Sequence, residues 1–297
     1  MITRHPGAIL RDLCTKGPVA APGAYNGLTA REVARAGFTA TYLSGGALSA
    51  SSGVPDIGVL TLDTFAERVR EVAQHSGLPV IADADTGFGE EEMVRRTVIE
   101  YNHAGAAACH IEDQVFPKRC GHLAGKQLIP VDHCVDKVKW AAQASNDCAG
   151  GDFIICARTD ARSVEGMSAA IERAHAYTEA GATMLFPEGL HSEDEFAEFA
   201  TAINKLTDST PLLLANMTEF GKTPHIPLDR FGQLGYHVVI YPVSTLRIAQ
   251  FAIAAFLRDL KATGTAAAWE DRMQTRTDLY ELLGYDPSST GYHFPAG

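Results

Sequence analysis

Residues 102–114 read NHAGAAACHIEDQ, which is the end of a helical stretch, a glycine, a short apolar run and then two acids. The same order recurs at 34–46 (ARAGFTATYLSGG), 178–189 (TEAGATMLFPEG) and 232–243 (GQLGYHVVIYPV). The glycine is typical of a residue that ends a helix, and the apolar run is typical of a short buried strand. The repeat therefore predicts successive helix–strand units.

Four further apolar runs fit between these units, at 19–24 (VAAPGA), 79–85 (PVIADAD), 153–160 (FIICARTD) and 211–217 (PLLLANM). The intervening segments have helical periodicity; the stretch 62–77, for example, carries an acid in its first turn and ends at a glycine. Apolar strands that alternate with helices indicate a parallel sheet covered by helices. Eight such units fit a (β/α)8 TIM-type barrel of the α/β class better than an open doubly wound sheet, and no GxGxxG follows the first strand.

Composition excludes several classes of protein. Of the 297 residues, 46% are hydrophobic and 21% are charged, which is ordinary globular usage and argues against disorder. The formal net charge of −11 without a basic block disfavours nucleic acid as a partner. The longest apolar run near the C-terminus, FAIAAFL, stops at Arg258, too early to span a membrane, and the N-terminal stretch lacks a signal-peptide core. We expect a cytoplasmic protein that does not bind a membrane.

The six cysteines are scattered, with no CxxC pair and no zinc-type spacing. Cys109 and Cys156 lie in apolar strand-like runs and are expected to be buried packing residues. Cys120 is different, because the stretch PKRCGH places it among Lys118, Arg119 and His122. Nearby cations lower the pKa of a thiol, so this loop predicts a reactive cysteine; the alternative is an exposed loop cysteine without a role.

In a barrel, the chemistry gathers at the C-terminal ends of the strands. The predicted strand ends carry polar residues that could form one pocket: Tyr25-Asn26, Ser44-Gly45-Gly46, Asp83, Asp85, Glu112-Asp113, Arg158, Asp160, Glu188, Asn216, Thr218 and Tyr241 to Ser244. Any single one of them is equally well explained as a cap residue that meets water. Together they predict a polar site at this end of the barrel.

Asp83 and Asp85 are two residues apart, so in a strand their side chains point the same way, and Glu112 ends the next strand. Clustered carboxylates repel one another unless a cation lies among them. An oxygen-only donor set favours Mg²⁺, with Mn²⁺ as the second choice, and the lack of a histidine near these acids in the sequence disfavours zinc. The alternative is that the acids cap helices or pair with lysine and arginine.

Other segments offer groups that bind anions. The SGG stretch at 44–46 presents backbone N–H groups to a carboxylate or phosphate, or else forms a tight turn. Arg158 could grip a carboxylate through its planar fork, or pair with a barrel acid instead. Arg247 and Arg276 are further possible clamps, with a surface position as the alternative.

The motifs YLSGG, DADTGFG, HIEDQ, KRCGH, CARTDA, FPE, ANMTEFG and MQTR occur in this order between about residue 5 and about residue 285. With them, the chain resembles the isocitrate lyase/phosphoenolpyruvate mutase superfamily, and within it most closely the 2-methylisocitrate lyases. The resemblance implies one (β/α)8 domain over 1–297, with 245–297 as a C-terminal helical segment and tail. It also implies that the last barrel helix is exchanged between subunits of a homotetramer.

The resemblance also assigns site residues. It implies Mg²⁺ at Asp83 and Asp85, with Asp56 and Glu112 supporting its water shell. Catalytic roles fall on Cys120, His122, Arg158 and Glu188. The substrate, a small di- or tricarboxylate, would be bound by Tyr42, Ser44, Gly45, Gly46, Gly121, Asn216, Thr218, Arg247 and Arg276.

The implied reaction is a retro-aldol cleavage of 2-methylisocitrate to pyruvate and succinate, a step of propionate catabolism. Cys120 would protonate the succinate carbanion, while Tyr42, Glu188 or a metal-bound water would take the hydroxyl proton. Alternatives are a 2,3-dimethylmalate or broader 2-alkylmalate lyase and other lyases of the isocitrate lyase type. An oxaloacetate hydrolase fits less well, because in those relatives a serine is expected where this chain has Pro242. The intact set of polar strand ends argues against a barrel that binds a dicarboxylate without turning it over.

Overall fold

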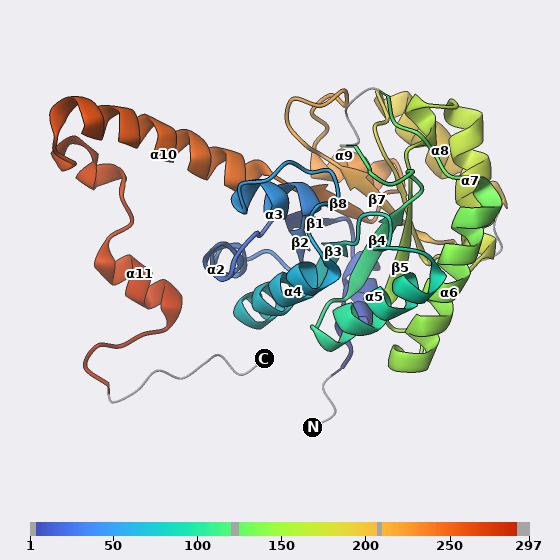
Figure 1. Ribbon diagram of the computed structural model, residues 1–297, viewed down its shortest axis with the longest axis horizontal. Helices are drawn as coiled ribbons and strands as arrows, with labels where there is room; N and C mark the ends of the chain where they lie inside the picture. Colours follow the sequence, from blue (N-terminus) through green and yellow to red (C-terminus); the bar gives the residue numbers. More distant parts are fainter. Residues whose placement is uncertain (1–3, 120–124, 207–209, 290–297) are drawn as a thin grey trace.

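Eight parallel strands with helices around them make up the main body of the protein, as the computed structural model shows for residues 4–119, 125–206 and 210–289 (Figure 1). The strands are β1 (Val19–Pro22), β2 (Thr41–Leu43), β3 (Val80–Asp83), β4 (Ala108–Glu112), β5 (Ile154–Thr159), β6 (Met184–Pro187), β7 (Leu212–Asn216) and β8 (Val238–Tyr241). Each begins within two residues of its predicted start, which confirms the eight-strand pattern.

The strands follow one another around a barrel. Each of β2 to β7 pairs in parallel with the next strand in the sequence, and β8 pairs in parallel with β1. Between β1 and β2 the contact is a single parallel bridge, Gly23 to Tyr42, in which the Ala24 amide donates to the Tyr42 carbonyl over 2.9 Å. The predicted (β/α)8 TIM-type barrel is therefore confirmed.

Helices fill the connections. The α-helices are α1 (Pro6–Cys14), α2 (Gly27–Arg35), α3 (Gly45–Ser51), α4 (Leu62–Ser76), α5 (Glu91–His103), α6 (Val131–Ala149), α7 (Met167–Glu179), α8 (Glu193–Leu206), α9 (Leu228–Gln233), α10 (Ser244–Thr263) and α11 (Arg276–Leu283). Short 3-10 turns are η1 (Ala161–Ser163) and η2 (Ala267–Arg272). None of the helices in the described parts of the chain has both the length and the apolar character needed to cross a bilayer.

Helix α4 shows how local sequence sets these boundaries. The Thr61 side chain accepts a hydrogen bond from the Thr64 amide at the N-terminus, and Asp63 lies in the first turn, where it complements the helix dipole. Gly77 ends the helix with φ of 65°, a conformation that glycine adopts at little cost. The prediction over 62–77 is therefore confirmed.

The core is built on both sides of the barrel wall. Inward-facing residues such as Ile81, Ile154 and Leu214 are fully buried in the barrel, while outward-facing residues pack against the helices. Cys109 and Cys156 have no exposed surface, as predicted for packing residues. On the helix side, the rings of Phe196, Phe231 and Tyr236 lie edge to face, with centroids 5.0 to 5.9 Å apart.

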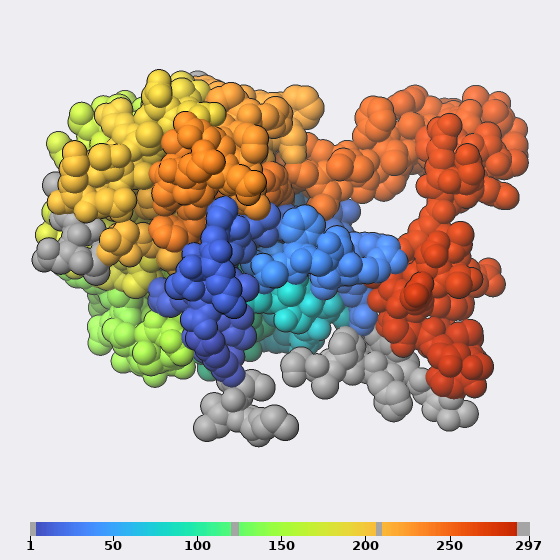
Figure 2. Space-filling view, turned by 180° about the vertical axis from the view of Figure 1, so that it is seen from behind, coloured from blue at the N-terminus to red at the C-terminus, as the bar shows by residue number. Residues whose placement is uncertain are grey.

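The C-terminal segment leaves the barrel. Helix α10 projects outward from the end of β8, and the chain then turns back so that α11 reaches α2 (Figures 1 and 2). The Arg31 guanidinium donates to the Leu282 carbonyl over 3.2 Å at this contact. Apolar side chains on α10 are left uncovered, with Phe251 78% and Ile248 71% exposed.

The aromatic cluster generates a prediction about stability. Phe231→Ala removes a fully buried ring and leaves a cavity between Phe196 and Tyr236, so we expect the free energy of unfolding to fall by about 3–5 kcal/mol in urea titrations. Phe220→Ala is the matched control, because that ring is 93% exposed, and a loss below about 0.5 kcal/mol is expected for it. Equal losses for both variants would contradict the packing argument.

Candidate functional site

A cavity of about 270 Å³ lies at the C-terminal ends of the strands. Many of the residues predicted from the sequence line it together: Tyr42, Ser44, Gly46, Asp56, Asp83, Arg158, Glu188, Asn216, Thr218 and Arg247. They lie on β2, β3, β5 and β7 and on the loops and helices that follow β2, β6, β7 and β8, so residues far apart in the sequence meet in one polar cavity.

The structure does not bring every predicted residue to this cavity. Cys120, Gly121 and His122 lie outside the described residues. Arg276 is exposed at the start of α11 and is not among the residues that line the cavity of this chain. Gly45 sits behind the lining, against Asp83.

Asp83, the last residue of β3, is held by backbone amides. Its two carboxylate oxygens accept hydrogen bonds from the Gly45 amide, over 2.9 Å, and from the Asp85 amide, over 3.0 Å. Burial alone would raise the pKa of Asp83, but the His110 ring and the Lys118 and Arg158 cations lower it to about 2.

This geometry corrects the interpretation of the SGG stretch. Ser44 is the N-cap of α3, with its hydroxyl accepting from the Ala47 amide, and Gly45 begins the helix. The Gly45 amide was expected to face a substrate anion, but it is already paired with Asp83. A Cβ at Gly45 would lie only 2.9 Å from the Asp83 carboxylate, which explains the glycine.

Lys118 lies among the acids. Its ammonium is 2.6 Å from Asp56 Oδ1 and 2.7 Å from Asp85 Oδ1, and its side chain is only 3% exposed. Burial alone would lower the pKa of Lys118, but Glu112, Asp83, Asp85 and Asp56 raise it above its usual value. The sequence predicted that Lys118 lowers the pKa of the Cys120 thiol; that thiol lies outside the described residues, and the ion pairs of Lys118 are with Asp56 and Asp85.

Several oxygens of the acid cluster have no hydrogen-bond donor among the described residues: Asp56 Oδ1, Asp85 Oδ1 and both oxygens of Glu112. The two aspartate oxygens in this set form ion pairs with the Lys118 ammonium, at 2.6 and 2.7 Å. Burial, and then the neighbouring Asp83, raises the pKa of Asp85 to about 6, and burial raises the pKa of Glu112 well above its usual value. Buried oxygen donors with unused lone pairs fit a hard divalent cation such as Mg²⁺.

His110 is a residue of this site that the sequence argument missed. It lies on β4, fully buried, with Nε2 2.6 Å from the Tyr42 hydroxyl and 3.6 Å from Asp83 Oδ1. The statement that no histidine lies near the acids was therefore wrong; the HIEDQ motif contained it. Burial lowers the pKa of His110 to about 4 and raises that of Tyr42 well above its usual value.

Arg158 projects from β5 into a ring of acids. Its guanidinium lies 3.0 Å from Asp160, 3.4 Å from Glu112 and 3.8 Å from Glu188. Burial alone would lower the pKa of Arg158, but these carboxylates raise it well above the usual value, so the side chain stays charged. The ion pairs with barrel acids, which the sequence left as an alternative, are present, and the same guanidinium still lines the cavity.

The opposite wall carries both polar and apolar groups. The Asn216 amide donates to Glu188 over 3.1 Å, and Arg247 donates to the Glu219 carbonyl over 2.6 Å while lying 5.1 Å from the centre of the Phe220 ring. Phe186, Ile240 and Pro242 supply apolar surface to the cavity. The sequence analysis placed Pro242 at this pocket but did not identify Phe186 or Ile240, because they look like any other strand residue.

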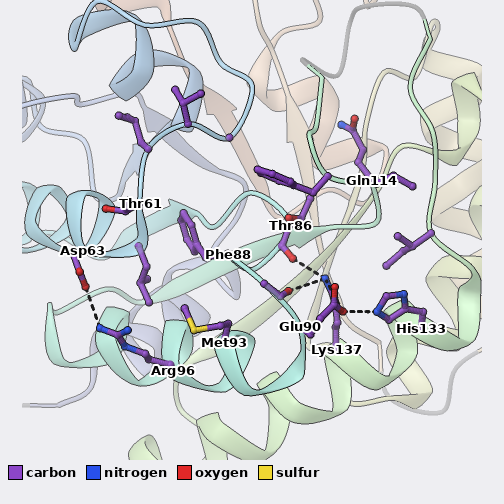
Figure 3. A pocket seen from close by; sticks show the side chains of 18 residues that line it. Thr61, Asp63, Thr86, Phe88, Glu90, Met93, Arg96, Gln114, His133 and Lys137 are labelled. Carbon is purple, nitrogen blue, oxygen red and sulfur yellow. Dashed lines mark hydrogen bonds and ion pairs between the residues drawn. The ribbon is translucent and has the colours of Figure 1, made fainter.

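A larger cavity of about 750 Å³ lies beside the site, between α4, α5, α6 and the loops after β3 and β4 (Figure 3). Its lining is mostly apolar, and the charged groups at its edges pair with one another: Asp63 with Arg96, and Glu90 with His133. Lys137 donates to the Thr86 and Gly89 carbonyls. Of the residues predicted for catalysis, the two that the structure describes, Arg158 and Glu188, do not line this cavity.

Comparison with known proteins connects this geometry to a family. The family model described as phosphoenolpyruvate phosphomutase matches residues 10–261. The chain is 51% identical to "Probable 2-methylisocitrate lyase 1" of Corynebacterium glutamicum, covering 89% of this chain and 84% of that one. It is 48% identical to 2-methylisocitrate lyase of Aeropyrum pernix, covering 95% of this chain and 88% of that one. It is 40% identical to 2,3-dimethylmalate lyase of Eubacterium barkeri, covering 92% of each chain.

Solved structures share the fold over nearly the whole chain. A crystal structure of 2,3-dimethylmalate lyase superposes with a TM-score of 0.86 at 36% identity, covering 95% of this chain and 92% of that one. Oxaloacetate acetylhydrolase superposes with a TM-score of 0.87 at 33% identity, covering 94% of this chain and 93% of that one. Phosphonopyruvate hydrolase in complex with oxalate and Mg²⁺ superposes with a TM-score of 0.82 at 28% identity, covering 95% of each chain. The chain belongs to the phosphoenolpyruvate mutase/isocitrate lyase superfamily, and it is an enzyme of the lyase class.

Proposed function

We propose that this lyase cleaves 2-methylisocitrate into pyruvate and succinate. The observation that carries the proposal is the cavity in which Asp56 and Asp83 of the carboxylate cluster lie beside Arg158 and Arg247. Unused carboxylate oxygens suit a divalent metal, and the arginines suit the carboxylates of a di- or tricarboxylic acid. The relatives named 2-methylisocitrate lyase share up to 51% of their residues with this chain, which favours their substrate over the alternatives.

Asp83 and Asp85 would hold the metal, with Asp56 and Glu112 beside them; Mg²⁺ is the first choice and Mn²⁺ the second. The phosphonopyruvate hydrolase complex with Mg²⁺ supports this assignment. When bound, the ion would polarise the hydroxyl of the substrate and make its proton more acidic.

The residues of the chain then orient the substrate and move its protons. Arg158, Arg247 and the amide of Asn216 would bind carboxylate oxygens of the substrate. Loss of the hydroxyl proton turns the C–O bond into the keto group of pyruvate as the C–C bond breaks, and the electron pair stays on the succinate fragment. Cys120 would donate a proton to that carbon as general acid.

Two side chains remain candidates for taking the hydroxyl proton. The Tyr42 phenol is disfavoured, because burial raises its pKa well above 10 and it therefore keeps its own proton at neutral pH. Glu188 lies in the same cavity, 1% exposed, and already accepts a hydrogen bond from Asn216. We therefore assign this role to Glu188 and substrate orientation to Tyr42.

A 2,3-dimethylmalate lyase is the second candidate. The 40% identity to the Eubacterium barkeri enzyme and the TM-score of 0.86 to a structure with that activity support it. The two substrates differ at one substituent, which is a carboxymethyl group in 2-methylisocitrate and a methyl group in 2,3-dimethylmalate, so a cavity group that binds the extra carboxylate would separate them. Both candidates use the same metal and the same bond cleavage.

Helix α10 supports a proposal about assembly. Its exposed apolar residues, which include Phe251 and Leu257, form a surface that a soluble monomer rarely presents to water. We propose that α10 packs on a neighbouring barrel and that the enzyme is a homotetramer, as the family resemblance implies. Arg276, which lies beyond α10, would then serve at the subunit boundary.

Substrate and metal are tested together. Keto-acid release is measured with 2-methylisocitrate, isocitrate and 2,3-dimethylmalate, each with Mg²⁺ and with a chelator. We expect fast release of pyruvate from 2-methylisocitrate and loss of activity with the chelator, restored by Mg²⁺. Preference for dimethylmalate would favour the second candidate, and cleavage of none of the three would contradict the proposed function.

The role of Cys120 predicts a selective defect. Cys120→Ser removes the thiol proton donor, so we expect kcat to fall by about 10²- to 10⁴-fold while Mg²⁺ binding stays within twofold. Cys148→Ser is the control, since that cysteine is half-buried at the end of α6, away from the cavity. A Cys120→Ser enzyme that keeps most of its activity would rule out the acid role.

The assembly proposal is tested by light scattering. We expect Phe251→Ser to shift the enzyme from a tetramer to smaller species, because it removes a large exposed apolar side chain from α10. Lys261→Ser, an exposed polar position on the same helix, should leave the mass unchanged. A wild-type monomer, or a Phe251→Ser tetramer of unchanged stability, would contradict the exchange of α10.

A further inference from the structure

The ammonium of Lys118 sits where the acid cluster needs a cation. It lies within 2.7 Å of both Asp56 Oδ1 and Asp85 Oδ1, and these are two of the oxygens without a hydrogen-bond donor among the described residues. The lysine side chain is 3% exposed and the Asp85 side chain 5% exposed. A buried lysine between two aspartates neutralises charge that would otherwise destabilise the cluster.

A metal ion that binds Asp85 through Oδ1 cannot share that oxygen with this ammonium. Mg²⁺ binds carboxylate oxygens at about 2.0–2.1 Å and requires near-octahedral space around it. An ammonium 2.7 Å from the same Oδ1 would occupy part of that space, and its charge would repel the ion. One cation must therefore move away when the other binds.

The rest of the Lys118 segment is tied down separately. The Gln114 side chain donates to the Arg119 carbonyl over 2.8 Å and accepts from the Arg119 amide over 3.0 Å. The Val115 amide donates to the Gln127 carbonyl over 2.8 Å. When Lys118 leaves Asp85, the segment loses that ion pair but keeps the hydrogen bonds of Gln114 and Val115.

We propose that Lys118 is an internal cation that competes with the metal for Asp85 and Asp56. The inference rests on the proposed function, since it takes these acids as the metal site. In the metal-free enzyme Lys118 stabilises the acid cluster, and metal binding releases it. Because coupling between two sites is reciprocal, the metal weakens the attachment of the segment 115–119 by as much as Lys118 weakens metal binding.

Calorimetric titration with MgCl₂ tests the competition without any measurement of activity. Lys118→Met keeps the length of the side chain and removes its charge, so we expect Mg²⁺ to bind about tenfold more tightly, within the 5- to 150-fold range of ordinary couplings. Lys118→Arg keeps the charge and should bind Mg²⁺ as the wild type does. Lys139→Met, which removes an exposed lysine paired with Asp136, is the control and should change the affinity less than twofold.

Each outcome has a distinct meaning. Equal or weaker Mg²⁺ binding by Lys118→Met, alongside clear binding by the wild type, overturns the competition and leaves the proposed function standing. No Mg²⁺ or Mn²⁺ binding by either protein overturns the metal assignment and the competition together. Binding by Lys118→Met alone supports the competition in its strongest form.

A second measurement uses the wild-type enzyme and so does not depend on how the variants fold. Lysines are acetylated with and without Mg²⁺, and the extent of labelling is read by mass spectrometry. We expect Lys118 to be labelled several-fold faster with Mg²⁺, because the metal releases it from the aspartates. Lys126 is the internal control, because its buried ammonium lies 2.6 Å from Asp160 Oδ1, and the extent of its labelling should not change. Labelling of Lys118 that stays constant or falls would overturn the proposal.

Discussion

The repulsion among buried carboxylates at one end of the barrel is the constraint on which the site depends. Asp83, Asp85 and Glu112 lie there with almost no exposed surface, and such groups remain charged only beside positive charge or good donors. Lys118 and Arg158 supply the positive charge, and the backbone amides of Gly45 and Asp85 supply donors to Asp83. What remains is a set of oxygens with unused lone pairs, which is the property that makes the cluster a cation site.

The barrel makes this arrangement possible because it brings successive strand ends together. The register pairs Asp83 of β3 with His110 of β4, and Glu112 of β4 with Arg158 of β5. Neighbouring residues in adjacent strands lie about 5 Å apart, so acids and cations meet without help from long loops. The chemistry of the site is in this sense a consequence of the order of the strands.

A second buried network holds the outer side of the same strands. Asp113 accepts hydrogen bonds from Thr159, Tyr177 and the Asp160 amide, at 2.7 to 3.0 Å. Asp160 in turn binds Arg158 and Lys126, which lowers the pKa of its carboxyl group despite its burial. The guanidinium of Arg158 is therefore positioned from behind, by residues that do not line the cavity, and the site gains rigidity from groups outside it.

The sequence by itself determined the barrel and most of the cavity. Helical stretches that alternate with eight apolar runs have one favourable solution, since each strand must bury both faces, and the polar residues at the strand ends then face one mouth. Only the tertiary structure decided which residues of the site contact one another. That Gly45 donates to Asp83, that His110 meets Tyr42 and that Lys118 pairs with Asp56 and Asp85 depend on distances between segments far apart in the sequence. The composition near Cys120 shows a lysine in this loop, but an ammonium pairs with the charges that lie near it in space, and only the folded barrel places Asp56 and Asp85 beside Lys118.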